Sequence, residues 1–236
     1  MNANAVRERE LRLSELFAIA TRVWRDRWGS VIAIVASINL PIEVVRALWV
    51  NLYNPSQPLR YLGLSLLSIV GLVASIAIVT LTDGAIAKRR VLFKPLLTQS
   101  FKQLLPVLQT FAILIVTVLV GTIFLIFPGI YFLTIYGMSV YVAALRNAIG
   151  LDALVESKDL VANQRLKVFI FGFVIFAIPA IASDFISTLL DPFLDITLIA
   201  IVKRLVVTFV VDFALMTHTI FFLNVEAISK LELEVK

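Results

Sequence analysis

A stretch of 43 residues, 103–145, contains no aspartate, glutamate, lysine or arginine. A helix of about 20 apolar residues crosses the hydrocarbon core of a bilayer, which is roughly 30 Å thick. This stretch is therefore too long for one transmembrane helix and long enough for two. Pro128 and Gly129, in the segment FPGIYF, predict the turn between them, because proline suits the first position of a new helix. We expect two transmembrane helices, at about 104–127 and 129–146.

The rest of the chain is nearly as apolar, and four more runs are long enough to cross a membrane. Hydrophobic residues make up 60% of the 236 residues and charged residues 16%, with a mean hydropathy of +0.98. A soluble domain carries about 25% charged residues. No polar stretch is long enough for a separate soluble domain, so we predict an all-α polytopic membrane protein with one integral membrane domain over residues 1–236. The four further transmembrane helices are expected at about 29–50, 61–87, 166–190 and 205–226.

Three amphipathic stretches complete the predicted architecture. They are LSELFAIATRVW, LTQSFKQLLP and LDALVESKDLVANQ, and in the third Asp152, Glu156, Asp159 and Asn163 form a polar stripe at helical spacing. Such helices usually lie in the headgroup plane, although they could also serve only to guide the chain into the next transmembrane helix. We expect three units, each an interfacial helix followed by two transmembrane helices.

Lysine and arginine are distributed unevenly along the chain. With six transmembrane helices, seventeen of the twenty-one lie in segments on the side that holds both termini. Cytoplasmic loops are enriched in these residues, so we expect both termini in the cytoplasm. On that side a basic patch either holds anionic lipid headgroups or only fixes the topology. The predicted basic patch consists of Lys88, Arg89, Arg90 and Lys94.

Ionisable residues inside the apolar runs are the candidate functional residues. An unpaired charge at mid-bilayer costs roughly 3 kcal/mol, so these groups should pair or reach the interface. Glu43 and Arg46 are three residues apart and can pair on one helix. Arg46 and Asp184 each follow a proline by five residues, so these two opposite charges could meet where the units pack. The predicted polar layer consists of Glu43, Arg46, Asp184, Lys203, Arg204 and, about two turns deeper, Asp212.

The polar layer has two interpretations. It is a pairing network that fixes helix packing, or it is a pocket for a lipid headgroup or small zwitterion, in which Arg46 would contact a phosphate with its guanidinium fork. The role of Asp212 also has two interpretations. It is a hydrogen-bonded helix contact, with Thr208 one turn earlier as its partner, or the proton-accepting group of a carrier.

Other chemistry is not indicated by the sequence. The chain has no cysteine and one histidine, His218, so a zinc site with three or four ligands is not expected. No GxSxG, HExxH or glycine-rich phosphate loop is present, and no nucleic-acid-binding module is recognisable. We predict a protein that is not an enzyme, holds no metal or cofactor and binds no nucleic acid.

Three quoted stretches together resemble a known family. They are LRLSELFAIATRVWRDRWGSVIAIVASINLP, LTDGAIAKRR with LLTQSFKQLLP, and FPGIYFLTIYGMSVYVAALRNAIGLDALVESKDLVANQRLKVF. They resemble the membrane domain of bacterial glycerophosphoryl diester phosphodiesterases and its stand-alone relatives, and the third is also similar to YciC-type inner-membrane proteins. The resemblance implies a six-span bacterial inner-membrane domain without the soluble catalytic barrel. The segment FFLNVEA, with Asn224 and Glu226, departs from the family's aromatic, acidic and basic ending.

These observations favour a bacterial membrane protein that organises lipids or partner proteins in the cell envelope. Its partners would be membrane lipids and other membrane proteins of the envelope. The alternative is a small transporter or flippase-like carrier for a lipid or another amphiphile. A carrier needs a continuous polar path from the polar layer through Asp212 to the opposite face near Asp83 and His218, and a scaffold needs none.

Overall fold

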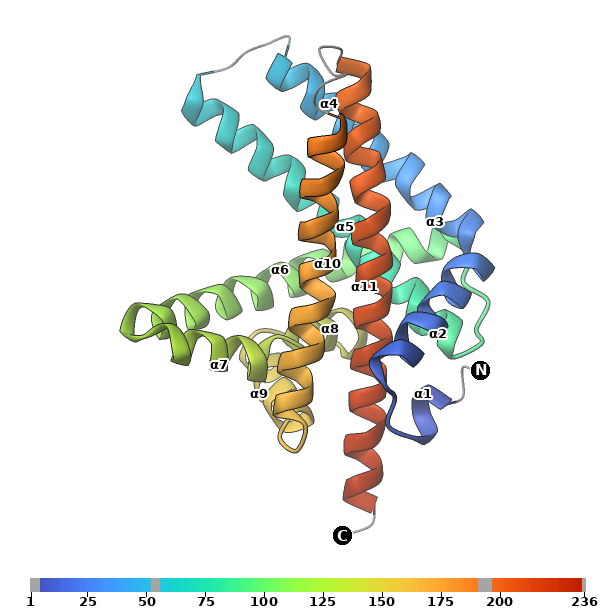
Figure 1. Cartoon of the computed structure of the whole chain (residues 1–236), viewed down its shortest axis with the longest axis vertical. Coiled ribbons are helices and arrows are strands. Elements are labelled where there is room, and N and C mark those ends of the chain that lie inside the picture. Colours follow the sequence, from blue (N-terminus) through green and yellow to red (C-terminus); the bar gives the residue numbers. More distant parts are fainter. Residues whose placement is uncertain (1–4, 52–55, 191–196, 235–236) are drawn as a thin grey trace.

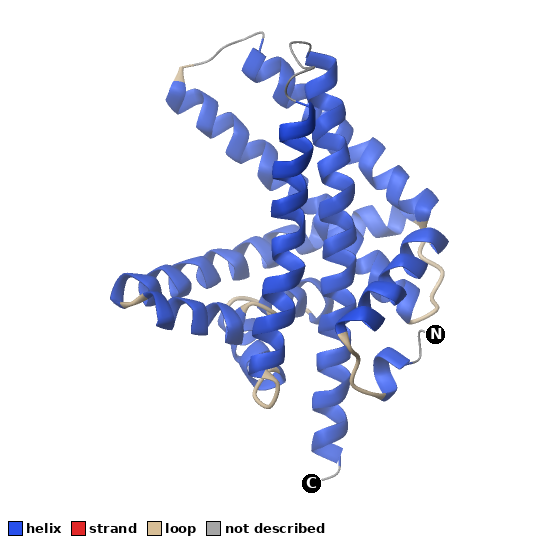
Figure 2. Cartoon of the chain, viewed as in Figure 1, coloured by secondary structure: helices blue, strands red, loops and turns tan. Residues whose placement is uncertain are grey.

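The computed structural model describes residues 5–51, 56–190 and 197–234, and in this part of the chain every regular element is a helix (Figures 1 and 2). Six helical segments have the length and hydropathy to cross a membrane, which confirms the all-α polytopic class. Their bounds lie close to the predicted ones, except that the third begins earlier and the sixth ends six residues later. The six segments are Trp28–Trp49, Gln57–Ile86, Phe93–Phe124, Ile126–Arg146, Arg165–Ile186 and Ile201–Glu232.

The first membrane segment contains a turn of π-helix. Pro41 has no N–H to donate to the carbonyl group of Ser37, and its ring crowds that carbonyl. The backbone immediately before it widens into a π-helix, which the structure places at Val35–Asn39. The first segment therefore consists of α3 (Trp28–Ile34), η1 (Val35–Asn39) and α4 (Leu40–Asn51), and it follows α1 (Ala5–Glu8) and α2 (Leu13–Asp26).

The charge-free stretch forms a helical hairpin, but its turn lies earlier than predicted. Leu125 alone is extended, with φ −167° and ψ 149°, and Pro128 belongs to the first turn of the second helix. A Cβ on Gly129 would overlap Thr122, so this glycine permits the two helices to approach closely. The hairpin consists of α6 (Phe93–Phe124) and α7 (Ile126–Tyr136), preceded by α5 (Gln57–Ile86) and followed by α8 (Ser139–Arg146).

Two further expectations differ from the structure. The amphipathic stretch 97–106 is the first part of α6 and not a separate interfacial helix. The sequence also predicts that Pro41 and Pro179 each interrupt the first membrane helix of a unit, but Pro179 lies inside a continuous α-helix without a π-helical turn. The remaining elements are α9 (Leu151–Leu160), α10 (Arg165–Leu190) and α11 (Thr197–Glu234).

The helix α11 forms the centre of the molecule. It packs against α10, α5, α4, α2 and α1, and its large side chains Met216, Ile220, Phe221 and Phe222 are fully buried. Figure 1 shows α10 and α11 running side by side along the long axis of the molecule, with α6 and α7 running crosswise to them.

The N-terminal helices attach to α11 by aromatic contacts and by one buried amide. The ring of Trp24 lies 6.1 Å from that of Phe209 and 5.8 Å from that of Phe213. Asn224 donates to the carbonyl oxygens of Val6 (2.9 Å) and Arg9 (2.8 Å), and its Oδ1 accepts from the backbone N–H of Leu11 (3.1 Å). These contacts hold residues 6–11 against α11.

Candidate functional site

Three members of the predicted polar layer meet between α4 and α11. Glu43 is buried, with 8% of its surface exposed, and its Oε2 lies 3.7 Å from Nε of Arg46 and 3.6 Å from Nε of Arg204. Both separations exceed a hydrogen bond, and neither Glu43 Oε2 nor Arg46 Nε has a hydrogen-bond partner in the described structure. Charge attraction alone joins these groups, so each keeps hydrogen-bonding capacity for a ligand.

The structure does not bring Asp184 to this group. Asp184 is exposed on α10, and Arg46 pairs with Glu43 on its own helix. The expected contact between Arg46 and Asp184 is therefore not formed. Lys203, which precedes Arg204 on α11, is partly buried. The layer predicted from the sequence is thus reduced to a smaller group, Glu43 with Arg46 and Arg204.

Asp212 lines a pocket between the first membrane segment, α5 and α11. The side chain is 4% exposed, and its Oδ2 has no hydrogen-bond partner in the described structure. The predicted partner Thr208 is not bonded to this oxygen, and its hydroxyl donates to the carbonyl group of Arg204 at 2.9 Å. The pocket has a volume of about 180 Å³ and is lined by Asn39, Ala74, Ser75, Val207, Thr208, Val211 and Asp212.

The pocket and the charged group lie on the same face of one antiparallel helix pair. Glu43 faces Arg204, and one turn further along the pair Asn39 and Thr208 line the pocket. Asn39 is the last residue of η1, the π-helical turn, and such turns frequently occur at functional sites. Since Arg204 and Asp212 are eight residues apart, they are separated by about 12 Å along the axis of α11.

Beyond Asp212 the next ionisable side chain of α11, His218, lies in an apolar environment. His218 is surrounded by aromatic rings, with centroid distances of 4.8 Å to Tyr141, 5.2 Å to Phe176 and 6.0 Å to Phe221. No hydrogen-bond partner of His218 Nδ1 is found among the described residues. The buried Thr217 and Thr219 donate to carbonyl groups of their own helix, so no hydrogen bond among the described residues links Asp212 to His218.

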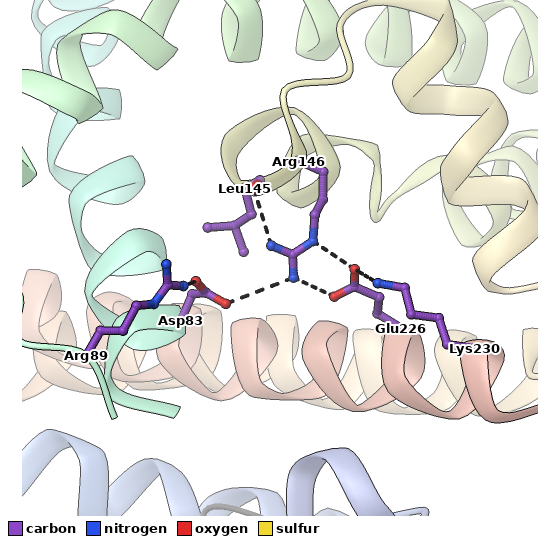
Figure 3. Close-up of polar contacts among 6 residues, drawn as sticks. All are labelled: Asp83, Arg89, Leu145, Arg146, Glu226 and Lys230. Carbon is purple, nitrogen blue, oxygen red and sulfur yellow. Dashed lines mark hydrogen bonds and ion pairs between the residues drawn. The ribbon is translucent and has the colours of Figure 1, made fainter. Parts of the chain in front are cut away.

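A second polar cluster, which the sequence analysis missed, joins the ends of three helices (Figure 3). Arg146, at the end of α8, donates to Glu226 of α11 from Nε (2.7 Å) and Nη2 (2.5 Å), a bidentate pair. Its Nη2 also lies 4.0 Å from Oδ1 of Asp83, near the end of α5. Arg89 binds Asp83 at 2.5 Å and Lys230 binds Glu226 at 2.8 Å, and we call these five residues the ionic cluster.

A signal for the ionic cluster is present in the sequence. Asp83, Arg146 and Glu226 each stand near the end of the second membrane helix of a predicted unit. Equivalent ends of repeated units would meet on one side, which is where the two carboxylates meet the guanidinium group. Arg89 of the predicted basic patch pairs with Asp83. The other three members of the patch, Lys88, Arg90 and Lys94, are exposed.

The fold and its buried charges define an all-α integral membrane protein with a polar pocket among its membrane helices. No protein-family model, no curated protein and no solved structure matches this chain. The resemblance to the membrane domain of glycerophosphoryl diester phosphodiesterases therefore stays a prediction from the quoted motifs.

Proposed function

We propose that this protein organises membrane lipids by binding the polar headgroup of an amphiphile between α4, α5 and α11. The observation that carries the proposal is the unpaired Oδ2 of Asp212, buried beside a pocket of about 180 Å³. An unsatisfied buried carboxylate oxygen is costly. A ligand that supplies a hydrogen-bond donor would remove that cost.

The charges along the interface favour a zwitterionic headgroup. The guanidinium group of Arg204 is half exposed and suits a phosphate, while the Asp212 carboxylate suits an ammonium group. The backbone positions of Arg204 and Asp212 are about 12 Å apart along the helix, so the long Arg204 side chain has to reach toward the pocket for one headgroup to contact both residues. The pocket volume of about 180 Å³ suits a small polar group such as the amine end of the headgroup.

The cellular setting belongs to the same proposal. The resemblance favours a bacterial inner membrane, and the distribution of lysine and arginine favours cytoplasmic termini. A role without enzymatic chemistry remains our expectation, because the polar groups that come together suit binding and pairing.

Lipid retention in native mass spectrometry tests the headgroup site. The native protein and the variants Asp212→Asn, Arg204→Gln and Arg60→Gln would each be titrated with phosphatidylethanolamine in detergent. We expect about tenfold weaker retention in the first two variants, since one charge-assisted hydrogen bond contributes about 1.5 kcal/mol. Arg60→Gln, which also removes one arginine but lies outside the site at the start of α5, should bind as the native protein does. Equal retention by all four proteins would contradict the proposal.

Transport of an amphiphile is the second candidate, and the buried Asp212 is the observation that favours it. A carrier that moves protons or cations uses such a group. Flux of labelled lipid in proteoliposomes separates the two roles. Flux that collapses in Asp212→Asn would support a carrier, whereas binding without flux would support lipid organisation. The aromatic enclosure of His218, below Asp212 on α11, leads us to expect binding without flux.

A further inference from the structure

The hairpin of α6 and α7 carries an unusually apolar tip. Five consecutive residues around the turn are exposed to between 66% and 82%, and none of them is polar. The ends of a transmembrane helix normally emerge among headgroups, where charged or amphipathic side chains are favoured. This tip lacks charged side chains. It consists of Ile123, Phe124, Leu125, Ile126 and Phe127.

Four hydrogen bonds that involve side chains join the hairpin to one short segment of the chain, residues 147–167, which we call the polar connector. Gln103, at the base of the hairpin, donates to Asn147 at 2.7 Å, and Tyr131, near the tip, accepts from Arg165 at 3.1 Å. Between them, the hydroxyl of Thr110 accepts from the N–H of Gly150, and the carbonyl group of Ile135 accepts from Ser157, both at 2.9 Å. The helix α9, inside the polar connector, packs against both α6 and α7.

The spacing of these contacts conflicts with a hairpin that crosses the bilayer. Gln103 lies 22 residues before Leu125 and Tyr131 lies six residues after it, so the two are about 24 Å apart along the hairpin axis at 1.5 Å per residue. In a crossing hairpin, Arg165 would then lie about 24 Å deeper than Asn147, across most of the 30 Å core.

Other contacts keep the polar connector on one side of the molecule. Lys167 pairs with Glu10 at 2.8 Å. Glu10 belongs to residues 5–12, which we call the N-terminal segment. Asn163 donates to Glu232, near the end of α11, at 2.6 Å. The polar connector therefore lies together with the N-terminal segment and the end of α11. In Figure 1 the hairpin runs crosswise to α10 and α11.

We infer that α6 and α7 do not cross the membrane but lie within one leaflet as an apolar hairpin. Four helical segments then cross: Trp28–Trp49, Gln57–Ile86, Arg165–Ile186 and Ile201–Glu232. The polar connector covers the headgroup side of the hairpin, and acyl chains of a single leaflet surround its tip. The turn suits this position, because Leu125 N–H donates to Gly121 O at 3.2 Å and Pro128 has no N–H to satisfy.

Depth measurements with spin labels test this arrangement. The chain has no cysteine, so each introduced cysteine carries the only label. Labels would replace Leu105, Val116 and Ile123 on α6, all at least 60% exposed. Matched labels at Leu166, Phe173 and Ile181 on α10 are equally exposed. Depth in liposomes follows from collisions of the nitroxide with oxygen and with a water-soluble nickel complex.

We expect the three α6 labels to lie within one leaflet, at depths that differ by less than about 15 Å, half of the hydrocarbon core. The α10 labels should pass from one interface through the bilayer centre. An α6 series that passes through the centre would overturn the inference. An α10 series confined to one leaflet would overturn it as well, because the membrane plane is defined by α10.

Labelling from the aqueous phases gives an independent result. A membrane-impermeant maleimide applied to each side of sealed vesicles would be compared for Ser56→Cys, Leu125→Cys and Asn147→Cys. We expect Ser56→Cys and Asn147→Cys to react from opposite sides, and Leu125→Cys to resist reagent on the side where Ser56→Cys reacts. Reaction of Leu125→Cys from that side would show that the hairpin crosses.

Discussion

At the scale of single residues, the buried carboxylates divide into paired and unpaired groups. Glu226 binds Arg146 in a bidentate pair, and Asp83 binds Arg89. Asp212 has a carboxylate oxygen without a partner in the described structure. A satisfied pair has little left to offer a ligand, whereas an unpaired oxygen beside a pocket does. We therefore assign the ionic cluster to stability and the Asp212 pocket to binding.

Removal of Arg146 should destabilise the protein strongly. Arg146→Ala leaves the side chains of Glu226 and Asp83, which are 7% and 9% exposed, without their central guanidinium group. Breaking a buried ion pair from one side costs about 3–5 kcal/mol, and the solvent-reachable Lys230 and Arg89 should reduce that cost to about 2–3 kcal/mol. Thermal unfolding in detergent measures the change.

Lys158→Ala is the matched control for that variant, because Lys158 is an exposed cation on α9. Its unfolding temperature should stay within about 1 °C or 2 °C of the native value, as expected for a surface substitution. Equal losses of stability in the two variants would show that the ionic cluster contributes no more than an ordinary surface charge.

At the scale of helices, small departures from regular geometry position the site. Pro41 is preceded by the π-helical turn η1, whose last residue, Asn39, lines the Asp212 pocket. Pro179 sits in α10 without any such turn. A proline therefore does not by itself predict a π-helix, since both α4 and α10 pack against α11 and only Pro41 is preceded by one.

The hairpin provides a prediction at this scale. Gly129→Ala places a methyl group against Thr122, at the crossing of α6 and α7, and should destabilise the protein by about 1–3 kcal/mol. At Gly29, in α3, nothing lies within 4 Å of an added Cβ. Gly29→Ala should therefore be neutral or slightly stabilising, since alanine favours a helix. Unfolding in detergent compares the two, and a neutral Gly129→Ala would contradict the close crossing.

The start of α2 should respond to acid. The guanidinium group of Arg9 and the backbone N–H of Arg12, both hydrogen-bonded to the Glu15 carboxylate, lower the pKa of Glu15 to about 2. Because the folded pKa lies below its ordinary value of 4.5, the stabilising contribution is complete above pH 4.5 and disappears as the pH falls to about 2.

Hydrogen exchange at the Arg12 amide measures this contribution. At pH 5 the amide should exchange more slowly in the native protein than in Glu15→Gln, which lacks the charge. At pH 2 the two proteins should exchange alike. A difference that persists unchanged at pH 2 would show that the charge of Glu15 does not stabilise the start of α2.

At the scale of the molecule, α11 connects the pocket, the ionic cluster and the N-terminal segment. Arg204 and Asp212 belong to the pocket region, Asn224 binds the N-terminal segment, and Glu226 belongs to the ionic cluster. A ligand in the pocket would therefore contact the same helix that binds the N-terminal segment.

Loss of the Asn224 amide should release the N-terminal segment. Asn224→Ala removes three hydrogen bonds with residues more than 200 positions away, at a cost of about 2–4 kcal/mol. Limited proteolysis with trypsin should then cut faster at the exposed Arg7, Arg9 and Arg12. Asn163→Ala, which removes one exposed hydrogen bond to Glu232, serves as the control. Equal cutting rates in the two variants would contradict this role of Asn224.

Much of the fold could be predicted because hydrophobic length is a local property. The six membrane segments follow from runs of apolar residues, and the structure places their ends within about four residues of the prediction, except that α6 begins eleven residues earlier and the last segment ends six residues later. The pairing of Glu43 with Arg46 was also local, since the residues are three positions apart. The ion pair between Arg146 and Glu226 could not be predicted in the same way, because the two residues are 80 positions apart in sequence. Only the packing of α8 against α5 and α11 brings them together.

The sequence by itself determined that this chain is a helical membrane protein. Its apolar runs avoid water in lipid, and there the backbone N–H and C=O groups of each run are hydrogen-bonded within a helix. It also determined which few charged side chains lie within those runs. Only the tertiary structure decided which of these charges meet and how the charge-free hairpin is oriented. The physical reason is that hydrophobicity sets how much of a helix avoids water, while long-range contacts such as Tyr131 with Arg165 set the direction in which it lies.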